Sequence, residues 1–316
     1  MGPDSACWQP VNEDSSYWEV TVPATSANLG PGFDCLGLAL NLHNRIWAKP
    51  SERLRFRVLG EGRGELPEDS SNLVWRAAQH LFEQVGYSPP PLSIVMKNDI
   101  PTSRGLGSSS AAIVGGLLLA NQLVPTPLTE QQLLDLATQL EGHPDNVVPA
   151  MLGGMVVSAT TSQQVVALSF PFPQELQLVA CIPNFRLSTS LARQVLPSQV
   201  NHGDATFNAS RIALLLAALL QRRYDLLAMA AEDRLHQPYR LGLIPGGAAA
   251  CQAARQAGAA AAMISGAGPT LLAIVPPGVA AAAVGQQMAS SLLASGVSAT
   301  YKLLQLDLQG AVARTL

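Results

Sequence analysis

The sequence predicts an α+β fold of two lobes that meet near residue 153. Of its 316 residues, 48% are hydrophobic and 13% are charged, which is typical of compact globular domains and not of disordered chains. Candidate strands and helices alternate along the chain, with no internal repeat and no low-complexity linker. After Gly153 and Gly154 the pattern changes to a run of strands. Each lobe is therefore expected to combine antiparallel strands with covering helices.

The first lobe is assigned to residues 17–153, after a loose extension at residues 1–16. A helix is predicted over residues 73–85, because a Ser-Ser-Asn sequence precedes the helical pattern and Gly86 stops it. Alternating and apolar-periodic segments predict the other elements: strands from residue 17 and at residues 45–49, 54–59 and 92–96, and helices over residues 107–122 and 129–140.

The second lobe is assigned to residues 154–316, where strands come first and helices follow. Its strands are predicted at residues 155–159, 165–169, 176–182, 261–265, 270–275 and 299–306. Its helices are predicted near Leu191 and at residues 207–235, 246–257 and 279–293.

Composition and charge exclude several classes of function. The net charge is −3 without any block of basic residues, whereas a nucleic-acid-binding protein normally carries a basic stripe. The longest strongly apolar run, residues 212–220, is well short of the roughly 20 residues that a membrane span needs. The N-terminus lacks the positive start and apolar segment of a secretory signal. The four cysteines form no CxxC pair, so we expect reduced thiols in a soluble cytoplasmic protein.

A glycine- and serine-rich turn between a predicted strand and a predicted helix is the first candidate binding element. It comprises Pro101, Thr102, Ser103, Arg104, Gly105, Leu106, Gly107, Ser108, Ser109, Ser110 and Ala111. At the start of a helix, free N–H groups and the helix dipole favour phosphate oxygens, and glycine lets the backbone approach them closely. The turn lacks the lysine of the GxxxxGK[ST] loop, and it is not a GxGxxG sequence. By itself it indicates phosphate binding or an ordinary helix cap.

Two further segments bear on the interpretation of this turn: residues 22–34 (VPATSANLGPGFD) and residues 264–270 (ISGAGPT). Together with the turn they resemble, in the expected order, the signature motifs of the GHMP superfamily (galactokinase, homoserine kinase, mevalonate kinase and phosphomevalonate kinase). The resemblance extends over about residues 17–306. It implies a two-lobed GHMP-kinase fold, with an N-terminal β/α lobe like domain 2 of ribosomal protein S5 and a ferredoxin-like C-terminal lobe. It also implies ATP-dependent phosphorylation of a small alcohol.

Within the superfamily, two segments resemble those of the homoserine kinase family: residues 141–150 (EGHPDNVVPA) and residues 183–197 (PNFRLSTSLARQVLP). This resemblance implies phosphorylation of the L-homoserine hydroxyl to O-phospho-L-homoserine, a step of threonine biosynthesis, and a homodimer is an expectation on the same ground. The main local departure is Thr102-Ser103-Arg104, where many relatives have glycine and small residues. We interpret Arg104 as pointing to solvent.

The resemblance assigns the nucleotide and metal sites. The turn, together with Asn72, Leu73 and Lys97, is expected to line the ATP site. Mg²⁺ needs oxygen ligands, and the resemblance assigns this role to Ser108 and Glu141. For Lys97, a solvated surface lysine is the alternative.

The resemblance also assigns the substrate site. Asp34 is expected to receive the ammonium group, with Asn28 and His143 beside it. Arg193 and Arg240 are expected to clamp the carboxylate, because the planar guanidinium suits two-point contact, and Thr189 assists them. For Arg240, an exposed loop cation is the alternative.

The predicted catalytic residues are Asn146, Asp145 and Arg193. Mevalonate-type and galactose-type relatives carry an aspartate base at about the position of Asn146, which cannot act as a base. Phosphoryl transfer can depend mainly on positioning and charge stabilisation. The hypothesis is therefore in-line attack of the hydroxyl without a dedicated carboxylate base, and Asp145 as the base is the competing possibility.

Two other functions are compatible with these residues. One is another kinase of the superfamily, of the mevalonate or diphosphocytidyl-methylerythritol type; the other is a ligand sensor without kinase activity. The combination of Asp34 with Arg193 and Arg240 favours an amino acid, because those alcohols have no ammonium group. The presence of both Ser108 and Glu141 favours a kinase.

Overall fold

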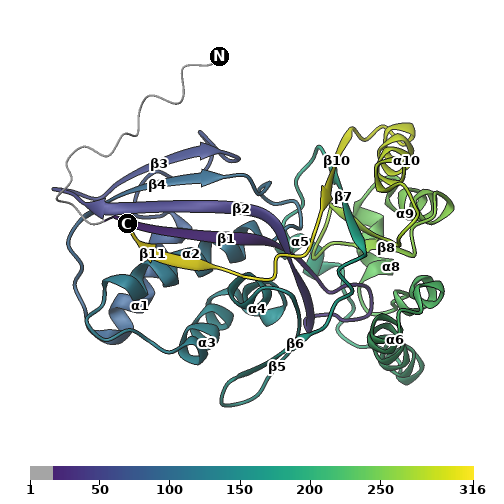
Figure 1. Cartoon of the computed structure of the whole chain (residues 1–316), viewed down its shortest axis with the longest axis horizontal. Coiled ribbons are helices and arrows are strands. Elements are labelled where there is room, and N and C mark those ends of the chain that lie inside the picture. The colour runs from purple at the N-terminus through teal and green to yellow at the C-terminus, as the bar shows by residue number, and fades with distance from the viewer. Residues whose placement is uncertain (1–16) are drawn as a thin grey trace.

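A long antiparallel pair of strands, β1 (Trp18–Ala27) and β2 (Leu36–Pro50), forms the centre of the first lobe (Figure 1). The computed structural model describes residues 17–316. The sheet has the order β11-β1-β2-β4-β3, and β5 joins the start of β2 and pairs with β6. Its other strands are β3 (Arg55–Gly60), β4 (Leu92–Asn98), β5 (Met155–Thr160), β6 (Val165–Phe170) and β11 (Val312–Thr315).

Four helices pack against this sheet (Figure 1): α1 (Leu73–Val85), α2 (Ser108–Leu123), α3 (Glu130–Glu141) and α4 (Pro144–Leu152). Local signals begin and end α1 and α3 close to where the sequence predicts. The Asn72 side chain accepts the Val74 N–H at the start of α1, and Gly86 ends that helix in the left-handed region. Thr129 and Gln132 form a capping box at the start of α3.

The second lobe contains an antiparallel sheet of the order β10-β7-β9-β8. Its strands are β7 (Gln177–Pro183), β8 (Ala261–Ile264), β9 (Leu271–Val275) and β10 (Ala299–Leu304). Helices separate β7 from β8 and β9 from β10, which gives the predicted ferredoxin-like succession. Along β7, Leu178 and Ala180 join the core shared with the first lobe, whereas Val179 and Cys181 join a second core beneath α9 (Gly247–Gln256) and α10 (Ala281–Ala294).

The region between β7 and α9 differs from its prediction. It contains α5 (Thr189–Gln194), α6 (His202–Leu220), η2 (Tyr224–Leu226), α7 (Leu227–Ala230), α8 (Gln237–Arg240) and η3 (Leu241–Leu243). The prediction of one helix over residues 207–235 is therefore wrong. The chain turns after α6 through Arg222, which adopts a left-handed conformation (φ 55°). No glycine or proline marks this position in the sequence, so pattern alone did not reveal the break.

Outside that region two elements were not predicted, α4 and β11. Pro144 stands at the first position of α4, where proline is tolerated, but Pro149 inside it argues against a helix. β11 pairs with β1, and the β5–β6 hairpin pairs with β2. Three strands from beyond residue 153 thus belong to the first sheet, so the predicted boundary at residue 153 does not coincide with the division between the two sheets.

One described helix, α6, is long and apolar enough to cross a membrane by length and composition. However, this helix also carries Asn208 and Arg211, which bind Asp233 and Glu232 respectively within the protein. These polar contacts are those of a helix that packs on its own chain.

The cysteines at positions 35, 181 and 251 are free thiols, and Cys7 lies outside the described residues.

Candidate active site

A cavity of about 310 Å³ gathers side chains from both lobes. Most of the predicted site residues line it: Asn28, Asp34, Asn72, Leu73, Thr102, Ser103, Arg104, Gly105, Gly107, Ser108, Ser109, Ser110, Glu141, His143, Asp145, Asn146, Thr189, Arg193 and Arg240. Four do not. Pro101, Leu106 and Ala111 are buried beneath the turn, and Lys97 is exposed on β4, as its surface alternative implied. The three predicted sites, for nucleotide, metal and substrate, are thus parts of one cavity.

The glycine-serine turn has the backbone that a close-fitting anion loop requires. Gly105 and Gly107 both have positive φ values, of 76° and 68°, and α2 begins directly after Gly107. A Cβ atom on Gly105 would lie 2.4 Å from the carbonyl oxygen of Ser265. The Ser265 hydroxyl in turn donates to the Gly105 carbonyl at 2.6 Å. The segment between β8 and β9 therefore packs directly on the turn.

Arg104 does not point to solvent, so that interpretation is wrong. Its Nε donates to the carbonyl of Phe185 at 3.0 Å, and its side chain lines the cavity. The backbone carbonyl of Arg104 also accepts the N–H of Thr270. Arg104 therefore joins the turn to the second lobe and places a positive charge at the cavity wall.

Glu141, the last residue of α3, faces the first turn of α2. Its Oε1 accepts a hydrogen bond from the Ser110 hydroxyl at 2.8 Å, and its Oε2 accepts one from Ser109 at 3.4 Å. Burial raises the pKa of Glu141 above its ordinary value of 4.5, and the two serine hydroxyls oppose that rise. Ser108 opens α2 on the same cavity wall. A carboxylate beside hydroxyls is a donor set that fits a hard cation such as Mg²⁺.

Asp34 and Arg193 bind each other across the two lobes. Arg193 Nη2 donates to Asp34 Oδ1 at 2.7 Å, and Nη1 donates to Oδ2 at 3.1 Å, so the pair is bidentate. Each side chain is about one-third exposed, at 33% and 37% respectively. Asn28 holds the backbone on both sides of this site, since its Oδ1 accepts the N–H of Asp34 and its Nδ2 donates to the carbonyl of Gly266. The predicted ammonium and carboxylate anchors are therefore in contact.

Arg240 is 1% exposed, which rules out the exposed loop cation. Its Nε donates to the carbonyl of Ala192 and its Nη1 to that of Gly266, both at 3.1 Å. Burial, together with the nearby charge of Arg193, lowers the pKa of Arg240 to about 10, so the guanidinium stays protonated at neutral pH. A second cation, buried in contrast to Arg193, thus stands beside the Asp34–Arg193 pair.

The start of α4 carries two of the three predicted catalytic residues, Asp145 and Asn146. His143 Nδ1 lies 2.6 Å from Asp145 Oδ1, and Thr25 donates to Asn146 Oδ1 at 2.7 Å. Burial lowers the pKa of His143, but the hydrogen bond and charge of Asp145 outweigh it, so the net pKa is raised above 6.5. A Cβ atom on Gly37 of β2 would lie 2.0 Å from the Asp145 carbonyl, so only glycine lets α4 approach the sheet this closely.

Several cavity residues were not predicted: Asn44, Leu66, Pro67, Ser71, Met96, Asn98, Ala112, Leu187, Gly266, Ala267 and Gly268. The segment between β8 and β9 was noted as a motif but given no binding role. For Leu66, Met96 and Leu187 the sequence offers no signal, because an apolar side chain that lines a cavity looks like one that fills a core.

Comparison with known proteins agrees with this geometry. Residues 72–154 match the GHMP kinases N terminal domain, and residues 215–293 match GHMP kinases C terminal. A homoserine kinase of Moorella thermoacetica is 47% identical over 293 residues, which cover 93% of this chain and 98% of the relative. One of Desulfitobacterium hafniense is 44% identical and covers 92% and 98% respectively. The crystal structure of homoserine kinase from Cytophaga hutchinsonii has a TM-score of 0.85 at 29% identity, covering 98% of this chain and 99% of that one. The chain therefore has the two-lobed GHMP-kinase fold and belongs to the homoserine kinase family of the GHMP kinases.

Proposed function

We propose that this protein transfers the γ-phosphoryl group of ATP to the hydroxyl of L-homoserine and so forms O-phospho-L-homoserine for threonine biosynthesis. The observation that carries the proposal is the convergence of Asp34, Arg193 and Arg240 in the same cavity as the start of α2. The helix start suits phosphate, and the three charges suit a small zwitterion.

The Asp34–Arg193 pair supports an amino-acid substrate. A zwitterion that enters between these side chains replaces one internal ion pair with two intermolecular ones, since its ammonium faces Asp34 and its carboxylate faces Arg193. Arg240 supplies a second guanidinium for the carboxylate. Asp34, His143 and Asp145 each place a ligand atom within 4.8 Å of the others, so a second carboxylate reinforces the ammonium site. Neutral alcohols such as sugars use none of these charges.

ATP and Mg²⁺ occupy the other end of the cavity in this proposal. The N–H groups at the start of α2 and the Arg104 side chain face the phosphates, and Asn72 and Leu73 line the nucleotide. Ser108 and Glu141 would hold Mg²⁺, which supplies charge stabilisation for the transferred phosphoryl group when it is bound.

The residues at the start of α4 position the substrate hydroxyl. Asn146 Oδ1 is held by Thr25 and its Nδ2 donates to Asp145 Oδ1 at 3.4 Å, so one amide proton is left to orient an oxygen in the cavity. Asp145 is 1% exposed and already accepts the His143 hydrogen bond. These contacts support in-line attack without a dedicated carboxylate base. The variants Asn146→Ala and Asp145→Asn test this: we expect a larger loss of kcat in the first, and a collapse of kcat confined to a correctly folded Asp145→Asn would identify Asp145 as the base.

The decisive experiment measures ADP release with L-homoserine, mevalonate and a diphosphocytidyl sugar alcohol at equal concentrations. We expect kcat/KM to be highest for homoserine. A preference for either other alcohol would overturn the substrate assignment. Tight ATP binding without ADP release from any of them would instead favour a sensor.

We propose a cytoplasmic location and a homodimer as further properties. Three unpaired cysteines support a reducing compartment. The dimer follows only from family resemblance, and light scattering of the purified protein tests it.

A further inference from the structure

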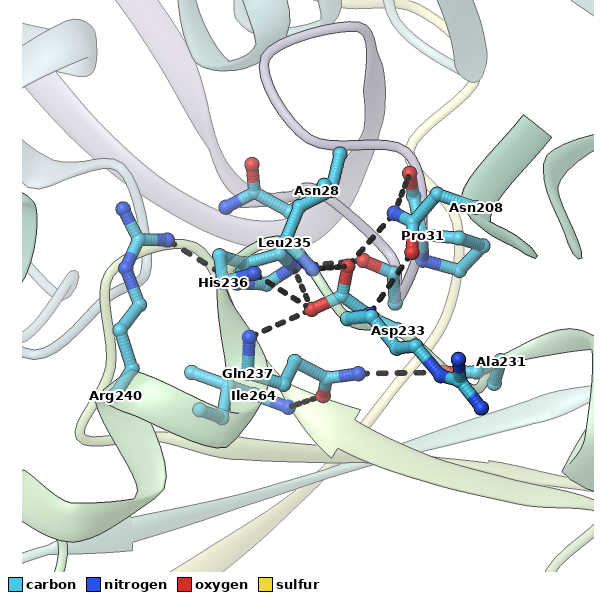
Figure 2. Close-up of polar contacts among 12 residues, drawn as sticks. Asn28, Pro31, Asn208, Ala231, Asp233, Leu235, His236, Gln237, Arg240 and Ile264 are labelled. Atoms are coloured by element: carbon cyan, nitrogen blue, oxygen red, sulfur yellow. Dashed lines mark hydrogen bonds and ion pairs between the residues drawn. The ribbon is translucent and has the colours of Figure 1, made fainter. Parts of the chain in front are cut away.

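A buried polar cluster lies beside Arg240 (Figure 2). Asn208 of α6, Asp233 and His236 are 2%, 8% and 0% exposed, and none of the three is among the described residues that line the cavity. Burying a carboxylate and an imidazole is costly unless each is fully hydrogen-bonded. The hydrogen bonds of these three side chains therefore show which parts of the chain the cluster holds in place.

Asp233 is held by four donors. Its Oδ1 accepts the N–H of Leu235 at 2.9 Å and the Asn208 amide at 2.8 Å. Its Oδ2 accepts the N–H of His236 at 2.9 Å and that of Gln237 at 2.6 Å. Asp233 thus fixes the backbone that leads into α8, whose last residue is Arg240.

The tautomer of His236 follows from its partners. Its Nε2 lies 2.7 Å from the carbonyl oxygen of Gly30, which can only accept, so Nε2 carries a proton. Its Nδ1 lies 3.3 Å from Nη1 of Arg240, which can only donate, so Nδ1 presents its lone pair. Burial lowers the pKa of His236, in agreement with a neutral ring. His236 therefore links two components of the substrate site through its two nitrogens.

The first component is the loop that carries Asp34. His236 holds its Gly30 carbonyl, and Asn208 Nδ2 donates to the neighbouring carbonyl of Pro31 at 3.3 Å. The His236 ring also stacks on Phe33, with centroids 5.3 Å apart, and the Arg240 guanidinium lies 5.2 Å from the same ring.

The second component is Arg240 itself. Within the described chain its Nε and Nη1 donate hydrogen bonds, whereas Nη2 donates none and is left for a ligand.

We propose that His236 is a positioning residue that acts through Arg240. Its Nδ1 lone pair orients the guanidinium toward the substrate carboxylate, and its Nε2–H holds the Gly30 carbonyl of the loop that carries Asp34. Asp233 fixes the backbone from which the His236 side chain extends. This inference rests on the proposed homoserine kinase function. It assigns roles to two side chains that lie outside the cavity.

Two substitutions separate the functions of the two ring nitrogens. His236→Asn places an oxygen near the position of Nδ1, so it keeps an acceptor for Arg240 and loses the bond to Gly30. His236→Gln places its amide near the position of Nε2, so it keeps a donor for Gly30 and loses the acceptor. We expect His236→Gln to raise KM for homoserine roughly five- to twentyfold, the effect of one hydrogen bond, and His236→Asn to raise it clearly less. KM for ATP is expected to stay within about twofold in both.

A double-mutant cycle tests whether His236 acts through Arg240. In an Arg240→Lys background, His236→Gln is expected to raise KM for homoserine by less than about twofold further, because the guanidinium that it orients is already gone. Additive effects, equal effects of the Asn and Gln variants, or a parallel rise of KM for ATP would overturn the proposal. His43→Gln is the matched control, since His43 contacts Asp307 at 2.6 Å and does not line the cavity. Failure of the wild-type protein to turn over homoserine would reject the proposed function instead.

The tautomer itself can be measured without activity. The ¹⁵N chemical shifts of the His236 ring in the wild-type protein are expected to show a neutral Nε2–H form at pH 7. A protonated Nδ1 at this pH would overturn the proposal. This measurement decides the question even if His236→Gln proves too unstable to purify.

Discussion

The charged residues of the cavity are one another's partners before any substrate arrives. Asp34 binds Arg193, His143 lies against Asp145, and Glu141 accepts hydrogen bonds from Ser110 and Ser109. Each pair satisfies charges that would otherwise be costly to hold in a half-buried cleft. A ligand must therefore replace these contacts with equally good ones, which favours substrates that carry both charges.

The first prediction at this scale concerns Glu141. Glu141→Gln removes the carboxylate charge but keeps the shape, so we expect the Mg²⁺ concentration for half-maximal rate to rise at least about tenfold, with a smaller change in KM for homoserine. Glu130→Gln is the control, because Glu130 is exposed at the opposite end of the same helix. An unchanged Mg²⁺ dependence in Glu141→Gln would remove Glu141 from the metal site.

The second prediction concerns pH. Asp145 raises the net pKa of His143 above its ordinary value of 6.5, so folding favours the protonated ring. That stabilisation is fully present below pH 6.5 and is lost as pH rises through the folded-state pKa. We therefore expect His143→Asn to lower the free energy of unfolding more at pH 5.5 than at pH 9, as measured by urea denaturation.

The control for this pH experiment is His80→Asn. The His80 side chain has no hydrogen-bond partner among residues 17–316 and lies outside the cavity. Its effect on unfolding is expected to be similar at both pH values. A His143→Asn effect that is also independent of pH would contradict the assigned pKa shift.

At the scale of elements, the glycine-serine turn and the segment between β8 and β9 form an interlocked pair. The Ser265 hydroxyl binds the Gly105 carbonyl, and the Thr270 N–H binds the Arg104 carbonyl. The turn thus belongs structurally to both lobes, although it lies in the first lobe along the chain. Its exact fit depends on the absence of a Cβ atom at Gly105.

A matched pair of glycine substitutions tests this fit. Gly105 and Gly64 both have a φ of 76°, but a Cβ on Gly64 would meet nothing within 4 Å. Gly64→Ala should lose only the left-handed preference, about 1–2 kcal/mol of unfolding free energy. Gly105→Ala adds a clash with the Ser265 carbonyl, so we expect a larger loss and a KM for ATP raised at least about fivefold. Equal losses in the two variants, measured by urea denaturation, would show that the contact is not restrictive.

At the scale of the whole molecule, the two lobes share one hydrophobic core. Leu178 and Ile182 of β7, Leu215 of α6 and Leu272 of β9 cluster with residues of the first sheet. In addition, β11 leaves the second lobe and pairs with β1 at the edge of the first sheet. Removal of either lobe would therefore expose apolar surface on the other.

This architecture predicts a single cooperative unfolding transition. In a Trp8→Phe variant the remaining tryptophans, Trp18, Trp47 and Trp75, all lie in the first lobe, so their fluorescence reports that lobe alone. Far-UV circular dichroism reports both lobes. We expect thermal melts by the two methods to coincide within about 2 °C. Two separated midpoints would show that the lobes unfold independently.

The sequence by itself determined the features that depend on a few neighbouring residues. Asn72 and Gly86 mark the two ends of α1, and Gly105 and Gly107 mark the glycine-serine turn, because caps and positive φ values are decided by local sterics and hydrogen bonds. Many of the residues that line the cavity could be named as well, through their resemblance to family motifs. The structure brings most of them together.

Only the tertiary structure decided the features that depend on residues far apart in the chain. Periodicity shows that a segment is a strand but does not name its partner, so the sequence did not show that the β5–β6 hairpin joins the first sheet, and β11 was not predicted at all. The same limit applies to side chains. The sequence does not distinguish a buried arginine from an exposed one, and Arg240 became a buried, oriented cation only when His236 and Gly266 were packed around it. Burial and partner choice are properties of the folded core, which no local segment contains.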